Sequence, residues 1–213
     1  MTRLLAPSFR YVPQYMWTGT LDTTCAHWAQ IEYADTLDTL GYRYQFYEFP
    51  VGHALPIGNE FGPMFAFMDF RRVVRDPPHI TYVLNDVMNE ADVGLNADHV
   101  YWLSDLTLRD DTLSPPIGTI DVFSHGFGVA DAPPTATQFE SGLMQGTAGP
   151  VPYTLQSRDW GTASPIPVRN QLDIRATNVS HVTIHPQRAR VDCNATLNVT
   201  SDGPLVVALA GCK

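Results

Sequence analysis

The sequence predicts an α/β fragment, the last two strand–helix units of a parallel sheet, followed by an antiparallel all-β sandwich-like domain. Residues 11 to 74 alternate strand-like and helix-like patterns with short connections between them. From about residue 79 the helical period stops, and short β-type runs punctuated by Pro and Gly take its place. We therefore expect two domains, residues 1–76 and 77–213, with a boundary at Asp76–Pro77–Pro78.

The composition allows a folded core and argues against two classes of partner. The chain has 213 residues, of which 44% are hydrophobic and 11% aromatic. A net charge of −9 disfavours nucleic acid and anionic membrane surfaces as partners. No apolar run reaches the roughly 20 residues needed to span a bilayer. The first residues also lack an apolar stretch of signal-peptide length, so we expect no signal peptide in this chain.

The first half reads strand, helix, strand, helix. Residues 11–19 and 42–50 are rich in aromatic and β-branched side chains and end at Gly or Pro. The first helix is predicted from about Thr24 to Leu40, and the second from about Asn59 to Val74. The side chains predicted to face the core are Cys25, Trp28, Ile31, Ala34, Leu37 and Leu40 in the first helix, and Phe61, Met64, Phe65, Met68 and Phe70 in the second.

The C-terminal residues carry a hairpin signal flanked by two cysteines. Asp202–Gly203 favours a two-residue type I′ turn, and the resulting register places Cys193 directly opposite Cys212. Opposed strand residues have the Cβ spacing that a disulfide needs, so we predict a Cys193–Cys212 bridge. Two buried free thiols are the alternative. A disulfide indicates an oxidising compartment, whereas Cys25 stands alone.

An Asp and a His follow the two predicted strands of the first half. Asp22 comes after the first strand and His53 after the second. Since the carboxyl ends of parallel strands lie at one edge of a sheet, the two side chains are expected to meet there. A carboxylate in that position can hold the imidazole in one tautomer while its other nitrogen activates a hydroxyl. Taken singly, the Asp is as readily a helix N-cap and the His a turn residue.

These residues occur in a recognisable order. The motifs are Gly19-Thr20-Leu21-Asp22, then Gly41-Tyr42, then Gly52-His53, followed by the Phe-rich helix. In this order the chain resembles the C-terminal part of the α/β-hydrolase family, especially secreted esterase-like and prolyl-oligopeptidase-like serine hydrolases, over about residues 11 to 74. The resemblance implies that Asp22 is the triad acid and His53 the base, in a secreted parent protein that cleaves ester or peptide bonds through an acyl-enzyme.

The family's nucleophile motif is missing. No Gly-x-Ser-x-Gly occurs in the sequence, and only 21 residues precede Asp22. We therefore expect a chain that keeps the acid and the His, lacks the Ser and is inactive alone. One alternative is a binding module carried by the β-rich part. The other is half of a split hydrolase, whose missing strands are supplied by a second chain. The partner expected is a missing N-terminal hydrolase half or a second copy of this chain.

Other candidate motifs are weaker. The run SHGFG at 124–128 superficially resembles a lipase oxyanion loop, but among β-type runs it is interpreted as a Gly-rich turn. His181 and His185 would share one strand face without a third ligand at suitable spacing. No metal site and no cofactor are expected.

Overall fold

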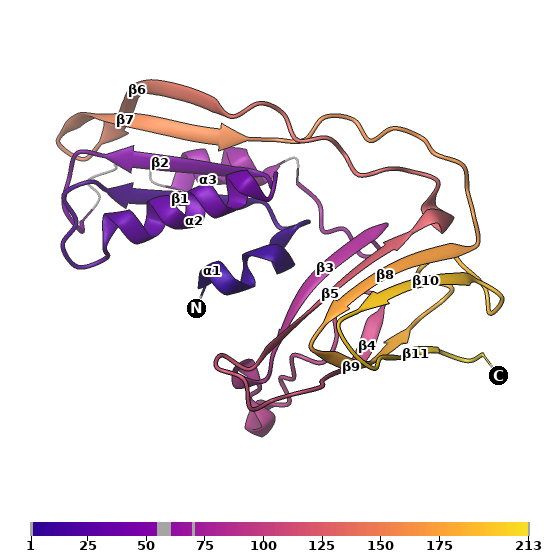
Figure 1. Ribbon diagram of the computed structural model, residues 1–213. Coiled ribbons are helices and arrows are strands. Elements are labelled where there is room, and N and C mark those ends of the chain that lie inside the picture. The colour runs from indigo at the N-terminus through magenta and orange to yellow at the C-terminus, as the bar shows by residue number, and fades with distance from the viewer. Residues whose placement is uncertain (1, 55–60, 70, 213) are drawn as a thin grey trace. The chain divides into compact units, whose positions relative to one another are not determined.

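The computed structural model describes residues 2–54, 61–69 and 71–212, which divide into two compact units (Figure 1). The first unit consists of Met1–Val73 and Ala132–Thr162, and the second of Val74–Asp131 and Ala163–Lys213. The described chain as a whole is built mostly of β-strands in mixed sheets, with only three short α-helices. The predicted fold class, an α/β fragment followed by an antiparallel sandwich, is therefore wrong.

The first unit contains one four-stranded sheet with the strand order β1-β2-β7-β6. Strands β1 and β2 are parallel, and β2–β7 and β7–β6 are antiparallel. The elements are α1 (Thr2–Leu5), η1 (Ala6–Phe9), β1 (Gln14–Gly19), α2 (His27–Thr39), β2 (Tyr44–Phe49), α3 (Phe61–Asp69), β6 (Gln138–Gly146) and β7 (Gly149–Arg158).

A hairpin from much later in the chain, β6 and β7, completes this sheet. In Figure 1 the orange strand β7 lies beside the violet strand β2, and β6 lies on the far side of β7, although β2 ends at Phe49 and β6 begins only at Gln138. The Trp160 indole Nε1–H donates to the Gly41 carbonyl oxygen at 2.7 Å, and the Gln156 side-chain amide donates to the Tyr44 hydroxyl at 2.7 Å. These contacts fix the hairpin segment on the N-terminal segment of the same unit, and a local sequence pattern contains no signal for such a long-range pairing.

The first helix is shorter than predicted, and this changes which side chains it buries. Ala34 and Leu37 are fully buried, whereas Trp28 is 65% exposed. Because α2 begins at His27 and ends at Thr39, Cys25 and Leu40 lie outside it. The fully buried side chains of α2 therefore lie in its C-terminal half, and the predicted core residue Ile31 is partly buried against the same core.

The second helix also departs from its predicted packing. Phe67 is buried at 8% exposure, whereas Phe65 and Met68, both predicted to face the core, are largely exposed. The predicted first residue, Asn59, and Phe70 lie outside the described residues. Neither α3 nor any other helix in the described ranges has both the length and the apolar character needed to span a bilayer.

The second unit packs two sheets around one core. Their strand orders are β10-β8-β5-β3 and β11-β9-β4. The pairs β10–β8 and β11–β9 are parallel and the other pairs antiparallel, so both sheets are mixed. The elements are β3 (His79–Asn85), η2 (Asp86–Met88), η3 (Ala91–Val93), β4 (Leu103–Leu108), β5 (Ile117–Ser124), η4 (His125–Phe127), β8 (Gln171–Thr177), β9 (Val179–Ile184), β10 (Thr196–Ser201) and β11 (Val206–Leu209).

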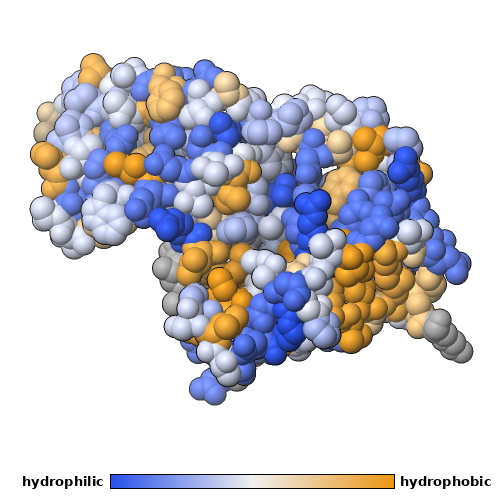
Figure 2. All heavy atoms as spheres, in the orientation of Figure 1, coloured by the Kyte–Doolittle hydropathy of each residue, from blue (hydrophilic) through white to orange (hydrophobic). Residues whose placement is uncertain are grey.

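The core of the second unit draws on both sheets. Ile120, Leu172 and Ile174 come from the first sheet and Val182 from the second, and all four are at most 1% exposed. Trp102 is fully buried among them, and its indole nitrogen donates to the Pro77 carbonyl at 2.8 Å. On the visible face of this unit, Figure 2 shows apolar side chains gathered over β10 and β11.

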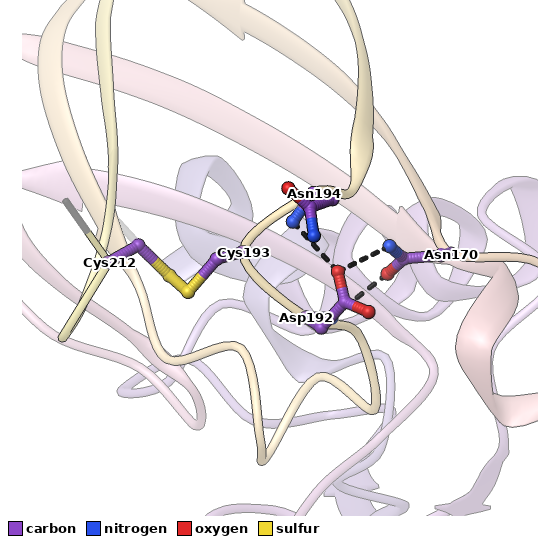
Figure 3. Close-up of a disulfide and its surroundings, with 5 residues drawn as sticks. All are labelled: Asn170, Asp192, Cys193, Asn194 and Cys212. Carbon is purple, nitrogen blue, oxygen red and sulfur yellow. Dashed lines mark hydrogen bonds between the residues drawn. A yellow bond between two sulfur atoms is a disulfide. The ribbon is translucent and has the colours of Figure 1, made fainter.

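The Cys193–Cys212 disulfide is confirmed, but the hairpin from which it was predicted is wrong. The two Cα atoms lie 5.4 Å apart, and Figure 3 shows the bridge. Strands β10 and β11 pair in different sheets, so they do not pair with each other. Asp202, the first turn residue, instead accepts the backbone N–H of Asn178 at 3.0 Å. That carboxylate thus ties the β10–β11 connection to the β8–β9 turn.

Polar contacts fix the chain next to the disulfide (Figure 3). The Asp192 carboxylate accepts a hydrogen bond from the Asn170 side-chain amide at 2.6 Å and another from the Asn194 backbone N–H at 2.7 Å. The Asp192 backbone N–H donates to the Asn170 side-chain oxygen at 2.9 Å. Cys193 is therefore held between two anchored neighbours at the entry to β10.

Candidate functional site

The carboxyl ends of β1 and β2 lie side by side in the first unit. Gly19 is in register with Phe49 in the parallel pair. Pairing continues past the strand ends, because the Thr20 N–H donates to the Phe49 carbonyl at 2.8 Å and the Leu21 N–H donates to the Val51 carbonyl at 3.0 Å. The segments that follow β1 and β2 are thus still hydrogen-bonded to each other just before Asp22 and His53.

Gly19 permits this close approach. A Cβ at this position would lie 2.4 Å from the carbonyl oxygens of both Val51 and Gly52. Backbone oxygens cannot rotate away as a side chain can, so a larger residue would push the two segments apart. The close approach of backbone is the local reason for a glycine at the end of β1.

Asp22 contacts His53 with one oxygen and its own turn with the other. Its Oδ2 lies 3.0 Å from His53 Nδ1. Its Oδ1 accepts the backbone N–H groups of Thr24 at 2.8 Å and Cys25 at 2.9 Å. Asp22 thus caps its own turn with one carboxylate oxygen and contacts His53 with the other. The Asp22 side chain is only 7% exposed, whereas that of His53 is 60% exposed.

The electrostatics of the pair favour one protonation pattern. The backbone N–H of Cys25 lowers the pKa of Asp22 most; burial opposes it, and His53 and the Thr24 N–H lower it further. An ionised carboxylate only accepts hydrogen bonds, so His53 Nδ1 carries the proton that faces it. The lone pair of neutral His53 is then on Nε2, which has no hydrogen-bond partner among the described residues. This nitrogen is the available base.

Sequence reasoning missed Cys25 as a member of the site. It was predicted to face the core from a helix, but the structure places it exposed and ahead of α2. One ligand atom each from Asp22, Cys25 and His53 lie within 4.8 Å of one another. A carboxylate, a thiol and an imidazole are all transition-metal ligands, so these three residues could hold a metal ion. The Asp-x-x-Cys spacing after a strand was the available signal.

Other Asp–His pairs in the described chain differ from this one. His79 has carboxylates at both ring nitrogens, Asp131 at 2.7 Å and Asp121 at 3.0 Å, so neither nitrogen is available as a base. His99 lies 2.8 Å from Asp98, but that carboxylate is 48% exposed. His53 combines a largely buried carboxylate with an exposed ring, the arrangement that an orienting acid and an accessible base require.

The weaker candidate motifs have structural partners. His181 Nδ1 lies 2.9 Å from the Asp105 carbonyl oxygen, and His185 Nε2 lies 3.0 Å from the Ser104 hydroxyl. The run at 124–128 forms the 3-10 turn η4, and Gly128 ends it at φ 67°. Ser124 is buried and its hydroxyl donates to the Ala189 carbonyl at 2.5 Å. These side chains are satisfied by the second unit's own fold.

The arrangement at the end of β1 and β2 can therefore take a proton from a nearby hydroxyl or water, or bind a cation. In the first case His53 would be the base, and the contact with Asp22 would fix its tautomer. Comparisons of the chain with protein-family models, with curated proteins and with solved structures found no match.

Proposed function

We propose that Asp22 and His53 are the acid and the general base of a hydrolase that cleaves ester or peptide bonds. The observation that carries the proposal is the 3.0 Å contact between Asp22 Oδ2 and His53 Nδ1, made by a carboxylate that two backbone N–H groups also hold. Support also comes from the order Gly-x-x-Asp, Gly-Tyr, Gly-His, which resembles serine hydrolases of the α/β-hydrolase family.

In the proposed reaction His53 Nε2 removes the proton of a nucleophile hydroxyl as the oxygen attacks the substrate carbonyl. The same proton then passes to the leaving alcohol or amine, and an acyl-enzyme remains. In the second half water attacks the acyl-enzyme and gives a proton to Nε2; the bond to the nucleophile oxygen then breaks, that oxygen takes the proton back, and the carboxylic acid product leaves. Asp22 stays ionised throughout, in keeping with its lowered pKa, and stabilises the imidazolium that forms twice in each cycle.

We further propose that the nucleophile comes from polypeptide outside the 213 residues, either a second segment or another chain. The sequence contains no Gly-x-Ser-x-Gly motif. Strand β1 lies at one end of the sheet order, so among the described strands its outer edge is unpaired. An added strand at that edge would end beside Asp22, where a nucleophile is needed. Such an edge also permits pairing with a second copy of the chain.

An oxidising, extracellular location is part of the proposal. It is supported by the Cys193–Cys212 disulfide, because such bridges persist mainly in secreted proteins.

Hydrolysis of an activated ester tests the base directly. An exposed, oriented imidazole accelerates hydrolysis of a p-nitrophenyl ester even without a serine, so the metal-free chain should show a rate above buffer. We expect His53→Gln to lower the hydrolysis rate in excess of buffer by about tenfold or more. The matched control is His99→Gln, since His99 also contacts an Asp and is similarly exposed. Equal losses in the two variants would refute a special role for His53.

A fluorophosphonate probe addresses the nucleophile. We expect no covalent labelling of this chain alone, and labelling after addition of the polypeptide that carries the nucleophile. Labelling of the isolated chain, located by peptide mass spectrometry, would place the nucleophile within these 213 residues and overturn that part of the proposal.

A further inference from the structure

We propose that Asp22, Cys25 and His53 form a binding site for a divalent transition metal, best suited to Zn²⁺, and that the bound ion inhibits the base. The metal site follows from the geometry of the three residues alone. The inhibitory role rests on the proposed hydrolase function, because it requires that His53 act as the base.

The donor atoms are of the right kind and close enough together. Zinc binds carboxylate oxygen, imidazole nitrogen and thiolate sulfur at about 2.0–2.3 Å, so two ligands of a tetrahedral ion lie on the order of 3.3–3.7 Å apart. Here the three ligand atoms lie within 4.8 Å of one another, and the Asp22 oxygen and His53 nitrogen are already 3.0 Å apart. Small side-chain rotations are enough to place all three around one ion.

The site combines an anchored ligand with two accessible ones. The Asp22 carboxylate is largely buried, and the backbone N–H groups of Thr24 and Cys25 hold its Oδ1 in place. Hydrogen bonds of this kind orient a metal-binding carboxylate. Cys25 and His53 are exposed, so an ion can reach them from solvent. Three protein ligands leave a fourth position for water, as in open zinc sites.

Zinc binding and base catalysis compete for the same imidazole. The Cys25 thiol loses one proton to solvent as the sulfur binds the ion. If His53 binds the ion through Nδ1, the ring proton moves to Nε2, which then carries a hydrogen and cannot accept another. If it binds through Nε2, the ion occupies that lone pair directly. Both geometries remove the base, so one bound zinc should abolish His53-dependent hydrolysis.

A single thiol makes the site easy to detect. The sequence has three cysteines, and Cys193 and Cys212 are joined in the disulfide. A cobalt–thiolate charge-transfer band in the disulfide-bonded chain of 213 residues can therefore arise only from Cys25. Titration with Co²⁺, followed by displacement with Zn²⁺, reports binding without any measurement of activity.

We expect one Co²⁺ per chain with a thiolate band. Cys25→Ser should abolish the band, and His53→Gln should weaken affinity about 10- to 100-fold. His53 is exposed, so this variant should keep the fold. His99→Gln is the matched control and should bind like the parent chain. Absence of the band, or an affinity equal in His53→Gln and the parent, would overturn the site, since the thiol would then bind alone or not at all.

The activity assay separates this proposal from the hydrolase proposal. We expect Zn²⁺ to inhibit the His53-dependent ester hydrolysis in proportion to the occupied sites. A rate that rises with Zn²⁺ would indicate hydrolysis by zinc-bound hydroxide and would overturn the inhibitory role. Suppose that the cobalt band depends on Cys25 and His53 but that the metal-free protein shows no His53-dependent hydrolysis. This result would uphold the metal site and refute the hydrolase function. His53-dependent hydrolysis without a cobalt band would refute the metal site alone.

Discussion

Gly19 and Gly52 lie so close that a Cβ on Gly19 would be 2.4 Å from the Gly52 carbonyl oxygen. We predict that Gly19→Ala forces the ends of β1 and β2 apart and lowers the free energy of unfolding by about 1–3 kcal/mol. The hydrogen bond between Asp22 and His53 should lengthen or break. Chemical denaturation measures the first effect, and the His53 Nδ1 proton resonance measures the second.

Gly52→Ala is the control for this variant. A Cβ at Gly52 would have no atom within 4 Å, and the backbone there does not require glycine. This substitution should therefore leave stability within about 0.5 kcal/mol of the parent. If both alanine variants behave alike, close packing at Gly19 does not hold the candidate site together.

Asp22 should make stability depend on pH. Hydrogen bonds from the Cys25 and Thr24 backbones and from His53 hold its folded-state pKa below the ordinary value of 3.8. The folded protein therefore keeps this carboxylate ionised where the unfolded chain protonates it. The resulting stabilisation is present above pH 3.8 and is lost as pH falls towards the lowered pKa. The stability difference between the parent and Asp22→Asn should shrink on acidification, as urea unfolding can measure. A pH-independent difference would contradict the lowered pKa.

Asp173 should give a second acid-sensitive contribution, in the other unit. Burial raises its pKa, but hydrogen bonds from His125, Gln171 and Asn198 outweigh burial and lower it to about 2. Its stabilisation is fully present above pH 3.8 and is lost as pH falls through about 2.

His125→Gln tests this assignment, because the His125 ring nitrogen lies 2.7 Å from the Asp173 carboxylate. We expect this variant to raise the Asp173 pKa towards its ordinary value. The carboxyl carbon resonance of Asp173, followed against pH in both proteins, measures the change. An unchanged titration midpoint would mean that the hydrogen bonds from Gln171 and Asn198 alone keep the Asp173 pKa low.

Removal of the disulfide should destabilise the second unit. Cys193 and Cys212 are 19 residues apart, and a loop of that length contributes about 3 kcal/mol in the chain-entropy view. We predict a loss of this size for Cys193→Ala with Cys212→Ala. Hydrogen exchange should rise in β10 and β11 and remain low in β1 and β2. Faster exchange in both units would show that the bridge stabilises more than the second unit.

Trp160 should fix the returning hairpin to the first unit. Its indole donates to the Gly41 carbonyl at 2.7 Å, and the Arg43 guanidinium lies 4.4 Å from the ring centroid. We predict that Trp160→Ala lowers the free energy of unfolding by about 1–3 kcal/mol and raises hydrogen exchange in β7. Trp160→Phe keeps an aromatic face for Arg43 and should lose less. Unchanged exchange in β7 would mean that strand pairing with β2 is sufficient.

The local parts of the structure could be predicted from the sequence. Strands β1 and β2 lie within the predicted runs because those runs are rich in aromatic side chains and end at Gly19 or Pro50. The parallel pairing of two strands joined by a helix follows from the same pattern. That Asp22 and His53 are adjacent is a consequence of this pairing, so their proximity could be anticipated.

The long-range parts of the structure could not be predicted from the sequence. Nothing in residues 138–158 indicates that they pair with β2 instead of the strands around them, since alternation specifies a strand and not its partner. The Asp202–Gly203 signal favoured a hairpin, but the Asp202 carboxylate bonds to the β8–β9 turn, and β10 and β11 join different sheets. Cys25 was missed because the helical period was extended to Thr24, three residues before α2 begins at His27.

The return of residues 132–162 to the first unit has a consequence for synthesis on the ribosome. After β2, which ends at Phe49, leaves the exit tunnel, about 100 more residues must be added before β7, which begins at Gly149, starts to leave it. At 5–20 residues per second this is a delay on the order of 5–20 s. During that interval the nascent N-terminal segment exposes a sheet edge to its surroundings. Chaperone capture of the growing chain should therefore be strongest before Arg158 emerges and should fall once β7 has docked.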